Sequence, residues 1–350
     1  MHANTFPATA ADPARFVGLH RFDDFTAEPT PTGRVLLSPA LKAPIDWNEL
    51  VVSWNATAPA GAWLKVEARA LYPDHQTKYY TLADWSLNAP GHVRQSVRHQ
   101  KDDDGDVKTD TWQLRRPGAD VQLRLTLGAT NLASPPELKF LGLAYLDTRV
   151  TPEEPASDRS AWGKIITTPE RSQHGYPQEE GWCSPTSLSM VLARWSDELH
   201  RPEMTLDVPA VASNVFDSTF GGTGNWTFNT AFAGSYPVMR AYVARLRDLT
   251  ELETWINAGI PVVISAPWHL LQPGRGNTGS GHLVVCIGFT ENGDVVINDP
   301  ATNLQKGQKV RHIYTRENVR TAWKASHNTV YLIYPETFTP PPDPLGHWDK

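Results

Sequence analysis

Apolar and polar residues alternate along several short segments in the first 150 residues of the chain. Residues 63–70 (WLKVEARA) and 121–127 (VQLRLTL) show this alternation most regularly. A period of two predicts strands with one buried and one solvated face, the pattern of antiparallel sheets. Further candidate strands, separated by turns that contain Gly, Pro or Asp, lie at 34–38, 50–54, 78–82, 110–114 and 138–146. Short strands at this spacing predict an antiparallel β-sandwich over residues 1–150.

A polar stretch with two prolines, residues 151–162, interrupts this pattern and is predicted to be a linker. Beyond it, apolar residues recur at helical spacing and predict helices over about 184–196 and 249–258. Between and after these helices, predicted strands lie at 260–265, 282–289 and 294–298. Residues 163–336 are therefore predicted to form an α+β domain, and 337–350 an extended tail.

The chain has 350 residues, enough for about two domains. Its 32 basic and 38 acidic residues give a net charge of −6, which argues against a nucleic-acid partner because a phosphate backbone needs a basic surface. No apolar run long enough for a membrane span and no signal peptide is visible, so the expected location is cytoplasmic, with export left open. Two cysteines, Cys183 and Cys286, are too few for a disulfide framework or a cysteine-rich zinc site.

Cys183 lies where the first predicted helix begins. Pro185 is tolerated only in the first turn of a helix, so it fixes the helix start near Ser184. The positive end of the helix dipole stabilises a thiolate there, and the thiolate is the nucleophilic form of cysteine. A small buried thiol without chemistry is the alternative reading, and we favour the reactive one. Cys286, within an apolar run, is predicted to be buried and inert rather than a redox partner of Cys183.

A thiolate nucleophile usually needs an imidazole partner, and His282 is the candidate by its context. It follows a Gly-containing loop and begins an apolar strand, which is followed by a hairpin signal and Asp299. A two-residue turn would leave Asp299 roughly 13 Å from His282 along the strand. A four-residue loop, 290–293, would pair Asp299 with Val284 and make it the diagonal neighbour of His282, about 7–8 Å away between backbones. We therefore predict this loop, with Asp299 rather than Asn298 orienting His282.

Several sequence blocks occur in the same order as in a known family. They are SQ at 172–173, GWCSPTS at 181–187, GNWTFN at 224–229, GIPVV at 259–263, GHLVV at 281–285 and NDPA at 298–301. Through these blocks the segment from about 165 to 300 resembles the C39-like family of bacterial cysteine peptidases, which have a papain-like fold. The resemblance covers about 130 of 350 residues and does not include the predicted sandwich.

The resemblance implies a role for each block. Cys183 would be the nucleophile, His282 the general base and acid, and Asp299 the residue that orients the imidazole. A glutamine upstream of the cysteine would complete the oxyanion hole, and Gln173 is the best position, with Gln178 as a second candidate. The implied reaction is hydrolysis of a peptide bond in a peptide or protein substrate. Neither a metal nor an organic cofactor is expected.

Four further residues within these blocks are candidates for substrate binding: Trp182, Asn225, Trp226 and Gly281. The sequence leaves open whether Trp226 lines a substrate groove or packs its loop onto the core. Substrate sequence and oligomeric state are not readable from the chain.

Two other functions remain possible at this stage. A thiol amidase or transpeptidase would use the same triad but release the acyl group to an amine. A non-catalytic binding protein would use the sandwich to bind a glycan or a surface partner. The sandwich tryptophans, such as Trp54, Trp63 and Trp85, are predicted to be core residues rather than sugar platforms.

Overall fold

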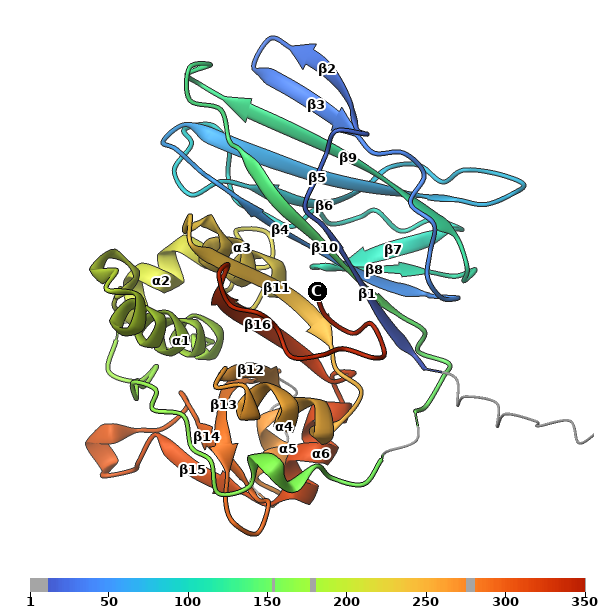
Figure 1. The fold of residues 1–350 in the computed structure, drawn as a ribbon. Helices are drawn as coiled ribbons and strands as arrows, with labels where there is room; N and C mark the ends of the chain where they lie inside the picture. The colour runs from blue at the N-terminus through green and yellow to red at the C-terminus, as the bar shows by residue number, and fades with distance from the viewer. Residues whose placement is uncertain (1–11, 153–154, 177–180, 275–280, 350) are drawn as a thin grey trace, which may run out of the picture.

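Two five-stranded antiparallel sheets form the first part of the computed structural model, which describes residues 12–152, 155–176, 181–274 and 281–349 (Figure 1). One sheet has the order β1-β10-β4-β8-β7, with bounds β1 (Ala14–Leu19), β10 (Leu138–Leu146), β4 (Glu49–Ala56), β8 (Thr111–Leu114) and β7 (Gly105–Lys108). The other has the order β2-β3-β9-β5-β6, with bounds β2 (Thr26–Thr30), β3 (Gly33–Leu37), β9 (Asp120–Ala129), β5 (Ala62–Leu71) and β6 (Tyr80–Trp85). Side chains of β4 and β10 share one apolar core with those of β5 and β9, so the two sheets pack against each other.

The two sheets differ in how they are buried. Strands β5 and β9 alternate buried and partly exposed residues over most of their length, as their sequence predicts. In β4 every residue is buried, because its outer face lies against the second part of the chain. The side chains of Asn55 and Ser53 on β4 hydrogen bond the backbone of the edge strand β11 (Met239–Arg245) at Ala241 and Val243, over 2.6–3.1 Å. These bonds satisfy backbone groups that an edge strand would otherwise leave unpaired.

The second part combines helices with a six-stranded antiparallel sheet. The sheet has the order β11-β16-β12-β13-β14-β15, with bounds β16 (Thr329–Pro335), β12 (Val262–Ser265), β13 (Leu283–Phe289), β14 (Val295–Asn298) and β15 (Arg311–Tyr314). The helices are α1 (Cys183–Leu199), α2 (Val208–Val215), α3 (Trp226–Ser235), α4 (Leu249–Asn257), α5 (Trp268–Leu271) and α6 (Arg316–Lys324), with 3₁₀ turns η1 (Arg159–Ala161), η2 (Pro202–Met204) and η3 (Leu304–Lys306). Figure 1 places α1, α2 and α3 together on one side of this part, and α4, α5 and α6 together on another. The mixed helix and antiparallel sheet agree with the α+β prediction.

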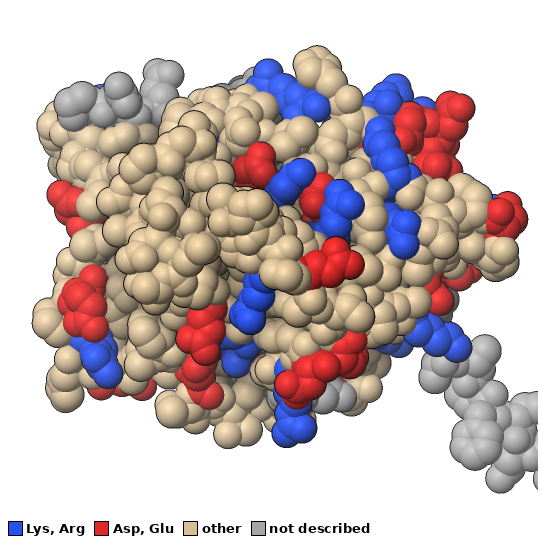
Figure 2. Space-filling model, turned by 90° about the horizontal axis from the view of Figure 1, so that it is seen from above, with Lys and Arg blue, Asp and Glu red and all other residues tan. Residues whose placement is uncertain are grey.

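Charged side chains of both signs are interspersed on the face of the molecule that Figure 2 shows, next to a broad uncharged area. This face therefore has no continuous basic surface of the kind that binds a phosphate backbone. Among the residues that the structure describes, none of the helices combines the length and the apolar character that a membrane span requires.

The end of the predicted linker packs against the second part of the chain. The indole N–H of Trp162 donates to the Glu253 carboxylate over 2.7 Å, and the N–H of Gly163 donates to the Phe289 carbonyl over 3.1 Å. With η1 and Trp162 anchored in this way, the later residues of 151–162 do not behave as a free linker.

The predicted tail has neither helix nor strand in residues 337–349, and its end is buried. The ring of Trp348 packs on Trp255 at 5.5 Å between centroids. Both ring nitrogens of His347 contact carboxylates, Nδ1 that of Glu251 over 2.7 Å and Nε2 that of Asp12 over 2.9 Å. The chain end marked C in Figure 1 thus lies between the two parts and joins them.

Arg245 is the centre of a buried charge cluster at the junction of the two parts. It is 3% exposed and donates to the Ser326 carbonyl over 2.8 Å. Its guanidinium lies 3.7 Å from the Glu49 carboxylate of the first part. The carboxylate of Asp110, also from the first part, accepts the N–H of Trp226 over 2.5 Å. Burial raises the pKa of Asp110 to about 6, although the N–H of Trp226 and the charge of Arg245 act in the opposite direction.

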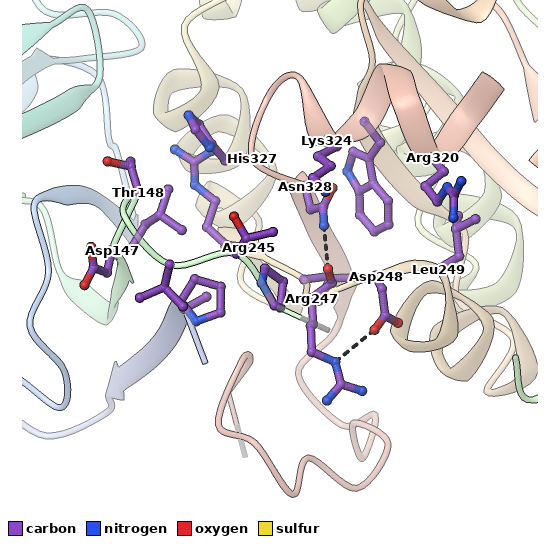
Figure 3. A pocket seen from close by; sticks show the side chains of 18 residues that line it. Asp147, Thr148, Arg245, Arg247, Asp248, Leu249, Arg320, Lys324, His327 and Asn328 are labelled. Atoms are coloured by element: carbon purple, nitrogen blue, oxygen red, sulfur yellow. Dashed lines mark hydrogen bonds and ion pairs between the residues drawn. The ribbon is translucent and has the colours of Figure 1, made fainter. Parts of the chain in front are cut away.

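A hollow of about 260 Å³ adjoins this cluster and is lined by both parts (Figure 3). Thr148 comes from the first part, and Arg245, His327 and Lys324 come from the second. None of the candidate site residues lines it, so it is separate from the chemistry described next.

Candidate active site

The start of α1 places Cys183 where the sequence predicts it. Gly181 adopts φ 81°, a left-handed conformation that favours glycine, and its carbonyl accepts a hydrogen bond of 2.8 Å from Thr223. The helix then begins at Cys183, with Pro185 in its first turn. Cys183 is 9% exposed, so its thiol lies in a nearly closed environment at the positive end of the helix.

The hairpin of β13 and β14 brings Asp299 to His282 by a route that differs from the prediction. Phe289 pairs with Val295, so the loop has five residues, 290–294, rather than four. A bulge between Cys286 and Gly288 then shifts the register back by one, and Val285 pairs with Asn298. This register brings Asp299 opposite Val284, as predicted.

The bulge has a cause outside the hairpin. Gly288 pairs with Ile165, and a Cβ on Gly288 would lie only 2.2 Å from the Lys164 carbonyl oxygen. The segment before the nucleophile therefore packs on this point of β13, and only glycine leaves room for it. The loop length could not be read from residues 289–294 alone because the bulge compensates for the extra residue.

His282 and Asp299 are in direct contact. Nε2 of His282 and Oδ1 of Asp299 are 2.8 Å apart, and both side chains are buried. The same carboxylate oxygen accepts the N–H of Ala301 over 2.9 Å. Burial raises the pKa of Asp299, but the charge and hydrogen bond of His282, with further donors, lower it to about 2. The carboxylate is therefore ionised at any pH near neutrality. Asn298 on the other face bonds the carbonyl oxygens of Thr168 and Pro169 instead, each over 3.4 Å.

The Cys183 thiol lies close enough to the His282 imidazole for each group to shift the pKa of the other. Because Nε2 of His282 is occupied by Asp299, Nδ1 is the nitrogen left for the sulfur. Burial raises the pKa of Cys183, but the hydrogen bond and charge of His282 and the backbone N–H groups of Leu283 and Ser184 outweigh it, so the pKa is lowered. Burial lowers the pKa of His282, but the charge and hydrogen bond of Asp299, together with Cys183, raise it. Both shifts favour a thiolate–imidazolium pair.

Tyr314 on β15 is a part of the site that the sequence analysis missed. Its hydroxyl donates to Oδ2 of Asp299 over 2.6 Å and accepts a hydrogen bond from the Gln272 side chain over 2.9 Å. Tyr314 thus holds the second oxygen of the carboxylate whose first oxygen contacts His282. Nothing in the local sequence RHIYT signals this role, because it depends on the pairing of β14 with β15.

Tyr314→Phe is expected to lower the rate of any reaction that uses the Cys183 thiolate roughly ten-fold, since a hydrogen bond to a charged group is worth about 1.5–3 kcal/mol. Loss of the hydroxyl raises the pKa of Asp299 and weakens its hold on the imidazolium, so the alkaline limb of the pH profile should move to lower pH. Alkylation rates of Cys183 measured across pH would show this shift. Tyr79→Phe, which removes a hydroxyl from the first part of the chain, serves as the control. Identical profiles for the two variants would contradict this role for Tyr314.

Gln173 is anchored next to the same strand end. Its backbone N–H donates to the Pro300 carbonyl over 2.9 Å, directly after Asp299, and the Ser172 hydroxyl donates to the Thr302 carbonyl over 2.5 Å. Gln173 is buried. The alternative, Gln178, lies outside the described residues.

The four candidate substrate-binding residues have different environments. Trp182 lines a groove beside the start of α1, and Gly281 is exposed directly before His282. The assignment of Asn225 to substrate was wrong, because its fully buried side chain accepts the N–H of Phe228 over 3.1 Å and caps α3. Trp226 is partly buried, packs against the apolar core and lies under the guanidinium of Arg245 at 5.2 Å.

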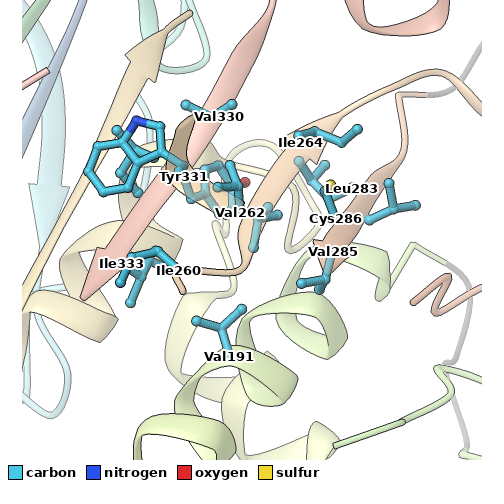
Figure 4. Packing of buried hydrophobic residues seen from close by; sticks show 14 of the residues in the cluster. Val191, Ile260, Val262, Ile264, Leu283, Val285, Cys286, Val330, Tyr331 and Ile333 are labelled. Atoms are coloured by element: carbon cyan, nitrogen blue, oxygen red, sulfur yellow. The ribbon is translucent and has the colours of Figure 1, made fainter. Parts of the chain in front are cut away.

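Cys286 has the inert environment that the sequence predicts (Figure 4). It is fully buried among strand residues such as Val285 and Ile264, and burial raises the pKa of its thiol to about 12. Both cysteines are free. The described residues contain no group of three or more His, Cys, Asp or Glu side chains arranged to hold a metal ion.

Comparisons with known proteins agree with this arrangement. Residues 165–331 match the model of the Peptidase_C39 like family, and residues 25–145 match the model of the Peptidase C39 N-terminal domain. The second part of the chain is therefore similar to the C39-like peptidases, and the first part is similar to the N-terminal domain found with them. No curated protein matches it.

Among solved structures, a provisionally assigned C39-like peptidase from Bacillus anthracis is 19% identical, covers 49% of this chain and 97% of its own, and has a TM-score of 0.36. The structure of infectious bursal disease virus strain Gt is 13% identical, covers 41% of this chain and 38% of its own, and has a TM-score of 0.25. A xylan-binding module is 14% identical, covers 40% of this chain and 95% of its own, and has a TM-score of 0.20. These likenesses are too weak to support an argument about function.

Proposed function

We propose that this protein hydrolyses peptide bonds with Cys183, His282 and Asp299 as a catalytic triad. The observation that carries the proposal is the imidazole of His282, whose Nε2 lies 2.8 Å from Asp299 and which is close enough to the Cys183 thiol to lower its pKa. This is the nucleophile, base and orienting-group arrangement of acyl transfer. The position of Cys183 at the start of α1 supports the same role, because the helix end stabilises its thiolate.

The thiolate of Cys183 attacks the carbonyl carbon of the scissile bond and forms a tetrahedral intermediate. The intermediate collapses when the carbon–nitrogen bond breaks and His282 gives its proton to the leaving amine, which leaves a thioester. A water molecule then attacks the thioester while His282 takes its proton, and the thiol is released with a carboxylic acid product. Asp299 stays ionised and keeps the imidazole oriented throughout.

The negative charge on the intermediate requires donors that are already in place. The backbone N–H of Cys183 at the helix start is one, and we assign the Gln173 side chain as the other. The anchoring of Gln173 to Pro300 supports this assignment, because it ties the glutamine to the strand end that carries Asp299. Removing one oxyanion donor typically lowers the rate by about 10²–10³. Gln173→Ala is therefore expected to lower the rate of hydrolysis by that amount while Cys183 still reacts rapidly with iodoacetamide.

The test is the pH dependence of iodoacetamide alkylation at Cys183, mapped by mass spectrometry. The lowered pKa of Cys183 keeps it a thiolate as pH falls, so labelling should remain fast at pH 6. In His282→Ala the thiol loses its cationic partner and should label roughly 100-fold more slowly at that pH, because an ordinary thiol is almost fully protonated there. Labelling of the wild type only near pH 8–9 would contradict the proposal.

Product analysis separates the remaining functions. Hydrolysis yields a free carboxylic acid, whereas an amidase or transpeptidase yields a new amide when an amine is added. A binding protein would retain its biological activity in Cys183→Ala. The first part of the chain gives little support to glycan binding, because Trp54 and Trp85 are buried and the ring of Trp63 stacks on His92 at 4.2 Å.

A further inference from the structure

A groove of about 630 Å³ lies beside the start of α1. Trp182, the residue directly before Cys183, forms part of its lining, so the groove adjoins the start of the helix that carries Cys183. One wall is made by α2 and the loop after it, including Phe216 and Gly222. Val93 and Arg94, from the first part of the chain, also line the groove. The groove is therefore built jointly by the two parts.

Exposed apolar side chains converge on this groove. Val93 is 58% exposed and Phe216 is 45% exposed, and both line it. Phe220, which is 48% exposed, packs beside Gly222 of the groove, where an added Cβ would lie 3.1 Å from the ring. Large apolar side chains gathered on a hollow surface mark a binding site more often than scattered ones do.

The charged groups at the groove are already engaged. The guanidinium of Arg94 donates to the carbonyl oxygens of Ser86, Ser213 and Phe216 over 2.6, 2.6 and 3.0 Å. Its charge also interacts with the buried carboxylate of Asp217. These bonds fix the first part of the chain against α2 and leave Arg94 with little capacity to bind an anion. The surface offered to a ligand is therefore without a free charge, and it combines the apolar side chains with the hydroxyl groups of Ser213, Ser218 and Thr223.

We infer that this groove binds a large apolar side chain of the peptide substrate, at one fixed position within two residues of the scissile bond, and that Val93 is a specificity-determining residue. The inference rests on the proposed peptidase function. The first part of the chain then takes part in substrate selection, because Val93 reaches the groove from that part. Burial of a large apolar side chain contributes about 1.5–3 kcal/mol, which corresponds to a preference of roughly ten-fold to more than a hundred-fold in kcat/KM.

The experiment compares cleavage of a synthetic peptide library by the full chain and by two variants, with cleavage sites identified by mass spectrometry. Val93→Glu introduces a charge at the groove, and Leu132→Glu makes the same change at an equally exposed residue of the same domain, 58% exposed and outside the groove lining. We expect the wild type and Leu132→Glu to cleave next to a large apolar residue at one position. In Val93→Glu the preference for a large apolar residue at this position should fall about ten-fold or more. Peptides with Lys or Arg at the same position should then be cleaved as well.

Two outcomes overturn the inference in different ways. If the wild type cleaves the library but Val93→Glu keeps the same preference as Leu132→Glu, the groove does not select the substrate, and the peptidase function stands. If the wild type cleaves no better than Cys183→Ala, the peptidase function itself fails, and the inference fails with it. Iodoacetamide labelling of Cys183 in Val93→Glu at the wild-type rate shows that the variant is folded and its thiol intact.

Discussion

Cys183→Ala is expected to lower peptide hydrolysis by about three orders of magnitude or more, since removing the nucleophile of a catalytic triad eliminates the covalent route. The remaining His282 and Asp299 cannot form a thioester, and only slow direct attack by water is left. Product formation from a cleaved library peptide, followed by mass spectrometry over hours, measures a loss of this size.

Cys286→Ala is the matched control for this experiment. Both cysteines are buried and free, but only Cys183 has a lowered pKa, whereas burial raises that of Cys286 to about 12. Turnover by Cys286→Ala should therefore stay close to that of the wild type. A protein in which both variants hydrolyse peptides equally well would have no catalytic cysteine.

Arg245→Met is expected to destabilise the protein by about 3–5 kcal/mol, because it removes one partner of a buried charge cluster and leaves the others uncompensated. The guanidinium lies 3.7 Å from Glu49 and its charge also stabilises the ionised form of Asp110. Methionine has a similar length, so the change removes charge more than volume. The loss of stability is measured by comparing the midpoint of urea unfolding of the variant with that of the wild type.

The pH dependence of this loss distinguishes charge from packing. Without Arg245, the pKa of Asp110 in the folded state should rise further above its unfolded value, so the folded protein holds a proton that the unfolded chain releases. Stability of the variant then falls as pH rises through that raised pKa, and the loss should be smaller at pH 5 than at pH 8. Arg247→Met, which breaks the partly exposed pair with Asp248, should cost no more than about 1 kcal/mol at either pH. If the loss of stability in Arg245→Met were the same at both pH values, it would come from packing alone and not from charge.

In the first part of the chain, the burial of β5 and β9 could be predicted from their alternating sequences, and the burial of β4 could not. Residues of β5 and β9 alternate because one face of these strands is solvated. The sequence of β4, ELVVSWNA, does not alternate, because its second face is covered by β11 and α3. No local pattern could identify that cover, since it comes from residues almost 200 positions later in the chain.

The position of Cys183 at a helix start was predictable because its signals are local. Gly181, Pro185 and the helical spacing after them define the start of α1, and the structure begins α1 at Cys183. The contact between His282 and Asp299 was predictable through strand register, although the loop was wrong by one residue. Asn225 was misassigned because an N-cap and a substrate ligand use the same polar side chain, and only its burial separates them.

The sequence by itself determined the alternating strands of the first part, the position of the thiol at a helix start and the strand that carries His282, because each depends on residues within a few turns or one hairpin. The tertiary structure decided which groups act on them. Tyr314 reaches Asp299 only through the pairing of β14 with β15, and Val93 reaches the groove beside Trp182 only because Arg94 fixes the first part of the chain against α2. Hydrogen bonds and packing between distant segments leave no periodic pattern in either sequence. They can therefore be identified only in the tertiary structure, where the two segments lie side by side.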